Sequence, residues 1–153
     1  MNPSPKKILW PTDFSALSLE AAQYARRYQE KFDAELHLLH VCPVLVNPGL
    51  EVELPTGLDL SVSQGNLTQA AKARLAQIAH DRFGEGSSIV CESLTGNAWP
   101  EICGYAERKG IDLIIVATHG LTGLRHSLLG GTAERIVRHA HCPVLIIKSI
   151  ERE

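Results

Sequence analysis

The sequence has no long uncharged apolar run. The longest, such as Leu113 to Ala117 and Pro143 to Ile147, are far shorter than the roughly 20 residues that a membrane-spanning helix needs. The first residues, Met1 to Lys7, lead directly into a strand-like segment, without the apolar stretch and small-residue cleavage site of a secretory signal. We therefore expect a cytoplasmic protein without a membrane partner.

The sequence also lacks an excess of positive charge. Fifteen Lys and Arg residues stand against seventeen Asp and Glu, a net charge of −2, so no basic field is available to attract nucleic acid. There is no C-x-x-C pair either: Cys42, Cys91, Cys103 and Cys142 lie far apart, which predicts reduced cysteines in the core. The rest is ordinary globular composition, 44% apolar and 21% charged in 153 residues, and we expect one domain over residues 1–153.

Hydrophobic periodicity alternates between short continuous apolar runs and longer stretches with helical spacing. The runs predict five strands, at residues 8–10, 36–41, 88–94, 113–117 and 143–148. Four helices are predicted between them: one capped by Asp13 or Ser15, with Leu17, Ala21, Tyr24, Ala25, Tyr28 and Phe32 inward, one through residues 67–79, one from Asn97 to Gly110, and one at 132–139. This alternation predicts an α/β fold, an open doubly wound parallel sheet.

The segment Pro43 to Gly65 breaks this rhythm, because it is long and rich in Pro and Gly. Connections of this length are usually functional or mobile. It is also apolar, which predicts that it packs against something. Two interpretations stay open: an extended loop that covers its own domain, or a lid over a ligand or a partner contact. It leaves the carboxyl end of its strand, which is the edge where open α/β sheets bind ligands.

Glycines gather between residues 117 and 132, where a buried strand ends and a helix begins. Gly120, Gly123, Gly130 and Gly131 allow close approach of backbone N–H groups, and the helix start adds unpaired donors. This combination suits phosphate, although the alternative of a merely structural turn stays open. The stretch is neither a P-loop nor the dinucleotide G-x-G-x-x-G fingerprint.

The same stretch resembles the phosphate loop of the universal stress protein family, G-x-x-G, nine residues, G-[ST]. Ala117 stands at the first glycine, Gly120 at the second, Leu121 to Leu129 are the nine residues, and Gly130 is the third glycine. Residues 7–15, 96–106, 112–117 and 142–148 resemble the family's opening strand and acidic turn, its third helix, its fourth strand and its closing strand. The resemblance covers nearly the whole chain and implies a Rossmann-like sheet with the strand order 3-2-1-4-5.

The resemblance also implies a site for ATP, or for ADP or AMP, with or without Mg²⁺. Asp13 would face the nucleoside, while the base would lie against Pro11, Thr12 and Val41. The phosphates would lie at the start of the last helix, against Ala117, Gly120, Gly130, Gly131 and Thr132. Two residues depart from the family pattern. Ala117 replaces a glycine, which is a mild change, and Gly131 stands where Ser or Thr is usual, which predicts weaker binding or less well organised metal assistance unless Thr132 supplies the hydroxyl. Asp13 has an alternative role as a plain helix cap.

No catalytic constellation is visible in the sequence. There is no G-x-S-x-G, no activated Cys and no carboxylate pair around a cleft. His37 and His40 lie three apart on a strand and so point to opposite faces, and we expect no metal site. His119, Arg125 and His126 either contact a polyphosphate or are solvated loop residues.

Three functions stay open. We expect a stress-response homodimer that binds an adenine nucleotide as a signal and pairs through the edge strand 143–148, with unknown protein partners. The alternative is a homodimeric adaptor that has kept the fold and lost the nucleotide, and the third possibility is a slow phosphohydrolase.

Overall fold

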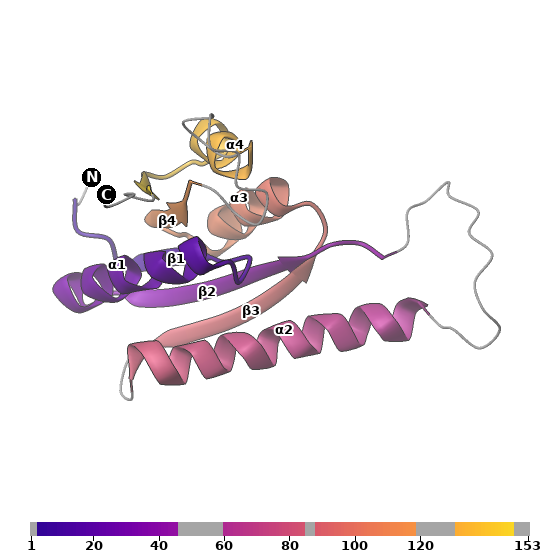
Figure 1. Cartoon of the computed structure of the whole chain (residues 1–153). Helices are drawn as coiled ribbons and strands as arrows, with labels where there is room; N and C mark the ends of the chain where they lie inside the picture. The colour runs from indigo at the N-terminus through magenta and orange to yellow at the C-terminus, as the bar shows by residue number, and fades with distance from the viewer. Residues whose placement is uncertain (1–2, 46–59, 85–87, 119–130, 149–153) are drawn as a thin grey trace, which may run out of the picture.

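The computed structural model describes residues 3–45, 60–84, 88–118 and 131–148, with the side chains of residues 60 and 61 excepted. Strands and helices alternate along the chain (Figure 1): β1 (Lys7–Pro11), α1 (Ala16–Phe32), β2 (Glu35–Cys42), α2 (Leu60–Phe83), β3 (Ile89–Thr95), α3 (Ala98–Lys109), β4 (Leu113–Ala117), α4 (Gly131–His139) and β5 (Val144–Ile147). No described helix has the length and apolar character needed to cross a membrane.

The five strands form one parallel sheet in the order β3-β2-β1-β4-β5. This confirms both the fold class and the strand order implied by the sequence. β1 lies at the centre, with Trp10 opposite Leu38 of β2 and Leu9 opposite Ile114 of β4. The chain therefore reverses its direction of strand addition between β1 and β4, which opens a crevice beyond their carboxyl ends.

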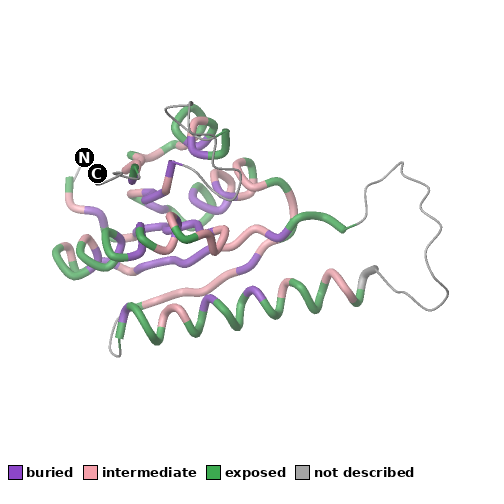
Figure 2. Tube along the Cα trace, in the orientation of Figure 1, coloured by how far each residue is buried: buried purple, intermediate pink, exposed green. Residues whose placement is uncertain are grey.

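Helices cover both faces of the sheet. One core cluster joins Ile8 and Trp10 to α1 and α2, and the other joins Leu9 to α3 and α4. Successive strand residues point to opposite faces, so Ile8, Leu9 and Trp10 are all fully buried although they pack in different layers. Figure 2 shows this burial concentrated in the strands and in the inner faces of the helices. The absence of alternation in the apolar runs is thereby explained.

The inner face of α1 is largely the predicted one, because Ala21 and Ala25 are buried and Tyr28 and Phe32 pack against the core. Its buried residues are Ser18, Ala21, Ala22, Ala25 and Gln29, whereas Tyr24, which we predicted to face inward, is 39% exposed. The small side chains of Ser18, Ala21, Ala22 and Ala25 form most of the buried face, and Tyr24 lies outside it. Ser15 is the N-cap, since its side chain accepts a hydrogen bond from the Ser18 N–H at 3.3 Å.

The helix α2 begins earlier than predicted. Residues 60–65 are helical, so the predicted loop 43–65 is wrong over its last six residues. Residues 46–59, where the loop or lid was predicted, lie outside the described part of the chain. Polar contacts hold this first part of α2: Gln64 Oε1 accepts from the Leu45 N–H at 2.9 Å, and the Thr68 and Thr95 hydroxyls are 3.4 Å apart. Apolar periodicity cannot detect a helix start fixed by such contacts.

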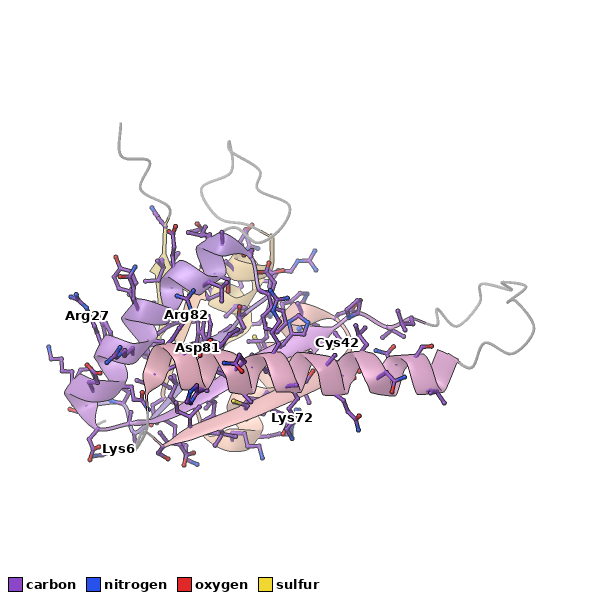
Figure 3. The ribbon with its side chains drawn as sticks, turned by 60° about the horizontal axis from the view of Figure 1, so that its bottom comes forward. Lys6, Arg27, Cys42, Lys72, Asp81 and Arg82 are labelled. Carbon is purple, nitrogen blue, oxygen red and sulfur yellow. The ribbon has the colours of Figure 1, made fainter. Side chains whose placement is uncertain are left out.

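The opposite end of α2 is tied to α1. The Arg82 guanidinium lies between the two helices (Figure 3) and donates to the Leu19 carbonyl at 3.5 Å. Arg26 of α1 donates in turn to the Arg82 carbonyl at 3.3 Å. The helix therefore runs along β2 and β3 with polar contacts at both ends and apolar contacts, through Ala71, Leu75 and Phe83, between them.

The helix α3 begins after Asn97 and ends at Gly110, as the sequence predicts. Gly110 has a φ of 66°, the left-handed conformation that favours glycine at a helix end. Tyr105 is the most buried large side chain of this helix, while Trp99 is half-buried and stacks on His139 of α4, with ring centroids 4.5 Å apart. The α3–α4 layer is thus closed at its rim by an aromatic pair.

Candidate functional site

A cavity of about 260 Å³ opens at the carboxyl edge of the sheet, between the ends of β1, β2 and β4 and the starts of α3 and α4. This is the crevice that the strand order predicts. It is lined by backbone and side-chain atoms of Pro11, Thr12, Asp13, Ser18, Leu39, His40, Val41, Ala98, Ile102, Val116, Ala117, Thr118, Gly131, Thr132 and Ala133.

Seven of the nine predicted site residues line this cavity: Pro11, Thr12, Asp13, Val41, Ala117, Gly131 and Thr132. They come from four separate elements, and the fold brings them together. The other two, Gly120 and Gly130, lie outside the described residues, as do His119, Arg125 and His126. Contact of any of the nine with a nucleotide stays a prediction.

The turn after β1 is held by its own side chains. The Thr12 N–H continues the ladder to the Leu39 carbonyl at 2.9 Å. The Thr12 hydroxyl accepts from the Phe14 N–H at 3.0 Å and lies 2.8 Å from the Ser18 hydroxyl, which donates to it. Asp13 Oδ1 accepts from the Ser15 N–H at 2.9 Å. These bonds fix the half-buried Asp13 at the cavity wall before any ligand arrives.

The same turn decides between two positions for the helix cap. Ser15 caps α1, and Asp13 accepts an amide one step before the helix. Asp13 is therefore an Asx-type turn residue and not the N-cap. Asp13 also lines the cavity, and its contact with a nucleoside stays a prediction.

His40 also lines the cavity, although it was not among the predicted site residues. Its Nδ1 lies 2.8 Å from the Thr12 carbonyl oxygen. A carbonyl can only accept, so Nδ1 carries the proton in this contact. The ring also stacks on Phe14, with centroids 4.4 Å apart. The place of His40 in the cavity could have been found from the sequence, because His40 directly precedes Val41 at a strand end, but its contact with Phe14 could not.

The start of α4 forms the opposite end of the cavity. The first-turn N–H groups of a helix have no partner within the helix, and the helix dipole favours negative charge there. Gly131 is the first residue of α4, and a Cβ added to it would have no atom of the described residues within 4 Å. Thr132 follows and is exposed. No Lys or Arg is among the described lining residues. The N–H groups in the first turn of α4 are therefore the main source of positive potential among those residues.

Apolar residues make up the walls between these two ends. Leu39, Ala98, Ile102 and Val116 line the cavity and were absent from the predicted site. Ala117 lines it as well, so its methyl group in place of a glycine hydrogen leaves the cavity open. Thr118 continues the strand, with its N–H bonded to the Ile147 carbonyl at 3.0 Å. A planar, mostly apolar ring suits these walls, while polar groups suit the two ends.

His37 and Tyr105 are two buried titratable residues that lie outside the cavity lining. His37 Nδ1 lies 2.7 Å from the Tyr105 hydroxyl and its Nε2 lies 2.7 Å from Glu35 Oε1. Burial, with the negative charges of Glu92 and Glu35, raises the pKa of Tyr105 to about 12. His37 therefore faces α3 and His40 faces Phe14, as predicted from their spacing. Within the described residues, no three His, Cys, Asp or Glu side chains are placed to hold a metal ion.

The four cysteines are free thiols, and Cys42 lies in the core as predicted, whereas Cys91, Cys103 and Cys142 are only partly buried. Cys42 is buried at the end of β2 (Figure 3), with its Sγ 3.4 Å from the Ser93 hydroxyl. Burial raises the pKa of the Cys91 and Cys103 thiols, and raises that of Cys142 to about 11. A raised pKa keeps these three thiols protonated at neutral pH, which disfavours them as nucleophiles.

Known proteins match the chain over almost all of its length. Residues 5–148 match the universal stress protein family. The chain is 40% identical over 150 residues to universal stress protein MJ0531 of Methanocaldococcus jannaschii, which covers 97% of this chain and 85% of that protein. The solved structure of MJ0577, from the same organism, has a TM-score of 0.78 at 29% identity and covers 96% of this chain and 98% of that one.

Two further solved structures share the fold at lower identity. One is a universal stress protein family protein from Arabidopsis thaliana with AMP bound, with a TM-score of 0.63, 20% identity, and coverage of 96% of this chain and 94% of that one. The other is a universal stress protein in complex with cAMP, with a TM-score of 0.67, 19% identity, and coverage of 94% and 97%.

Proposed function

Because the chain belongs to the universal stress protein family, we propose that it binds an adenine nucleotide in the cavity at the carboxyl edge of the sheet. ATP, ADP and AMP are the candidate ligands, with or without Mg²⁺. The bound nucleotide serves as a signal in a stress-response homodimer. The proposal is for binding, with at most slow hydrolysis.

One observation carries this proposal: the cavity joins a carboxylate-bearing turn at one end to a helix N-terminus at the other. Asp13 suits the hydroxyl groups of a ribose, because a carboxylate accepts hydrogen bonds. The start of α4 suits phosphate. Leu39, Ile102 and Val116 supply an apolar wall suited to a base. The spacing of polar, apolar and positive features thus follows the chemistry of a nucleotide.

The two nucleotide-bearing structures support the proposal from outside the chain. The same fold holds AMP in the Arabidopsis thaliana protein and cAMP in the second protein. Both ligands contain an adenosine and a phosphate, which are the two parts that the cavity ends suit. The low identity means that the contacts in this chain must be measured directly.

The experiment is a titration of the purified chain with ATP, ADP and AMP, each with and without Mg²⁺, followed by calorimetry and thermal melting. A ligand selective for the native state at a concentration of 100 times its Kd stabilises it by about 2.7 kcal/mol. That corresponds to a rise in Tm of roughly 5–10 °C for a chain of this size. GTP is the control for the base, and mass spectrometry of nucleotide released from the purified protein identifies a co-purified ligand.

The adaptor alternative rests on Gly131, which supplies no hydroxyl where the family usually has Ser or Thr. If millimolar ATP, ADP and AMP all leave both the melting curve and the calorimetric trace flat, nucleotide binding is refuted and the adaptor function replaces it.

The homodimer is proposed from the edge of the sheet. In the described part of the chain β5 pairs with β4 on one side, and Val144, Leu145 and Ile146 are half-buried. An apolar unpaired edge attracts another strand, and a two-fold axis satisfies it with one antiparallel copy.

Sedimentation velocity tests the dimer. Ile146→Lys places a charge in the proposed contact and should convert the dimer to monomer at tens of micromolar, while Val137→Lys, at an exposed position of α4, is the matched control. A dimer unaffected by Ile146→Lys would move the interface elsewhere.

A further inference from the structure

Phe14 has an unusual backbone conformation directly beside the cavity. Its φ is 64°, in the left-handed region that a bulky residue rarely adopts. It follows Asp13 in the chain, and its N–H is bonded to the Thr12 hydroxyl at 3.0 Å. A strained residue of this kind persists when its surroundings hold it, and such residues gather at functional sites. The question is what holds Phe14 and what its position achieves.

Two side chains from other elements hold the Phe14 ring. On one side lies the imidazole of His40 in β2, with centroids 4.4 Å apart and planes inclined by 29°. The guanidinium carbon of Arg74 in α2 lies 4.2 Å from the Phe14 ring centroid. We call Arg74, Phe14 and His40 the clamp. The clamp joins α2, the turn after β1 and the end of β2.

His40 holds the same turn by a hydrogen bond as well. Its Nδ1–H donates to the Thr12 carbonyl at 2.8 Å, so the neutral ring has its lone pair on Nε2. Among the described residues, no hydrogen-bond partner of Nε2 is found. The ring therefore fixes the peptide between Thr12 and Asp13 through one nitrogen and the ring of Phe14 through its face. Asp13 lies between these two fixed points.

We propose that His40 and Phe14 are positioning residues that set selectivity for the nucleoside part of the ligand, by holding the Asp13 carboxylate at the cavity wall. This rests on the proposed nucleotide binding. The clamp acts on the β1 end of the cavity alone, because none of its members contributes to the start of α4. It should therefore change the affinity for adenosine and AMP and leave the affinity for a bare polyphosphate unchanged.

The clamp also predicts a link between the site and α2. Arg74 is exposed and reaches Phe14 from the helix surface. A planar guanidinium stacks on an aromatic face, and the compact ammonium group of a lysine makes a weaker contact there. Arg74→Lys keeps the charge and removes the planar contact. It should weaken AMP binding in the same direction as a change at His40, but by a smaller factor.

The main experiment compares three substitutions of His40 by calorimetry with AMP, adenosine and inorganic tripolyphosphate. Asn places an N–H donor near the position of Nδ1, Gln places one near Nε2, and Leu has none. His40→Leu and His40→Gln should weaken AMP and adenosine about tenfold, whereas His40→Asn should lose about threefold. Tripolyphosphate affinity should stay within about twofold in all three. His80→Leu, at an exposed position of α2, is the control.

A second measurement needs no ligand. Hydrogen exchange reports local opening, and the Phe14 and Ser15 amides are bonded to the side chains of Thr12 and Asp13. Their exchange should accelerate roughly tenfold in His40→Leu and in Phe14→Gly, which relieves the strain but removes the ring. It should change less in His40→Asn. Amides of β2 serve as the internal control for overall stability.

These measurements separate failure of this inference from failure of the proposed function. If the wild-type chain binds none of the three ligands, the proposed function fails, and the exchange data alone decide whether the clamp holds the turn. If wild type binds AMP but Asn, Gln and Leu at position 40 weaken it equally, or weaken tripolyphosphate as much as AMP, the positioning role of His40 is overturned. Unchanged exchange at Phe14 and Ser15 in both variants overturns it as well.

Discussion

The two ends of the cavity are built from different parts of the chain. At the β1 end, side chains form the cavity wall: Thr12, Asp13 and His40 each make a defined hydrogen bond that fixes the turn. At the α4 end, backbone groups form the wall, since Gly131 has no side chain and Thr132 is exposed. For the proposed nucleotide, this contrast predicts that selectivity and charge binding are separable. Side chains at the β1 end would contact the nucleoside, while the helix N–H groups would bind the phosphate with little dependence on side-chain identity.

The largest effect is expected from Asp13. Asp13→Ala should weaken AMP and ATP by roughly 10- to 100-fold, the factor expected for a lost charged hydrogen-bond acceptor, and leave tripolyphosphate binding unchanged in calorimetry. Asp13→Asn is the control, because its carbonyl oxygen can still accept from the Ser15 N–H. If Asn restores AMP affinity in full, the carboxylate only shapes the turn.

A negative charge placed at the α4 end of the cavity should raise the stability of the fold and weaken phosphate binding. Gly131→Asp adds a carboxylate to the first turn of α4, which favours the helix by about 0.3–1 kcal/mol. The same charge repels phosphate, so ATP should bind about tenfold more weakly while adenosine is unaffected. Thermal melting without ligand and calorimetry with ATP check the two signs. Unchanged ATP affinity would remove α4 from the phosphate site.

A hydroxyl at the same position should strengthen the phosphate end. Among the described residues, no atom lies within 4 Å of a Cβ added to Gly131, and its φ is outside the left-handed region, so we expect Gly131→Ser to be accommodated without backbone strain. We expect ATP and AMP to bind about threefold more tightly, since the net gain from one hydrogen bond at an exposed position is about 1 kcal/mol or less, while adenosine affinity stays constant. Calorimetry with all three ligands makes the comparison. Equal gains for adenosine would contradict the division between the two ends.

The smallest effect on binding is expected at Ser15, although this residue adjoins the site. Ser15→Ala removes the N-cap of α1 and should lower the free energy of unfolding by about 1 kcal/mol. The ratio of AMP to tripolyphosphate affinity should not change, because the Asp13 carboxylate is still bonded to the residue 15 N–H. Urea denaturation measures the first quantity, and Ser15→Asp, which keeps a capping oxygen, is the control.

Most of the fold could be predicted because its strands are continuous apolar runs. Leu113–Ala117 is buried by helices on both faces, and such a run has few other structures available in a chain that alternates strands and helices. The start of α2 could not be predicted, since Gln64 and Thr68 fix it through polar contacts. Tyr24 was misplaced for a related reason: periodicity locates a helical stripe but not the small residues that form most of its buried face.

The site divides in the same way. Pro11, Val41 and Ala117 could be predicted, because they lie at the carboxyl ends of parallel strands. Once the strand order is known, these ends meet at one edge of the sheet. The role of His40 was not predictable, because it depends on Phe14 adopting a left-handed conformation. Sequence pattern favours glycine for that conformation. Where a bulky residue adopts it, the partners that hold it come from distant parts of the chain.

The two tryptophans give each layer of the molecule its own chromophore. Trp10 is fully buried against Phe83 in the α1–α2 layer, with ring centroids 6.1 Å apart, and Trp99 lies in the α3–α4 layer on His139. Fluorescence of Trp99→Phe therefore follows the first layer, and fluorescence of Trp10→Phe follows the second. Coincident melting of the two signals would show that the sheet couples both layers in one cooperative unit, whereas separated transitions would show that each layer unfolds on its own.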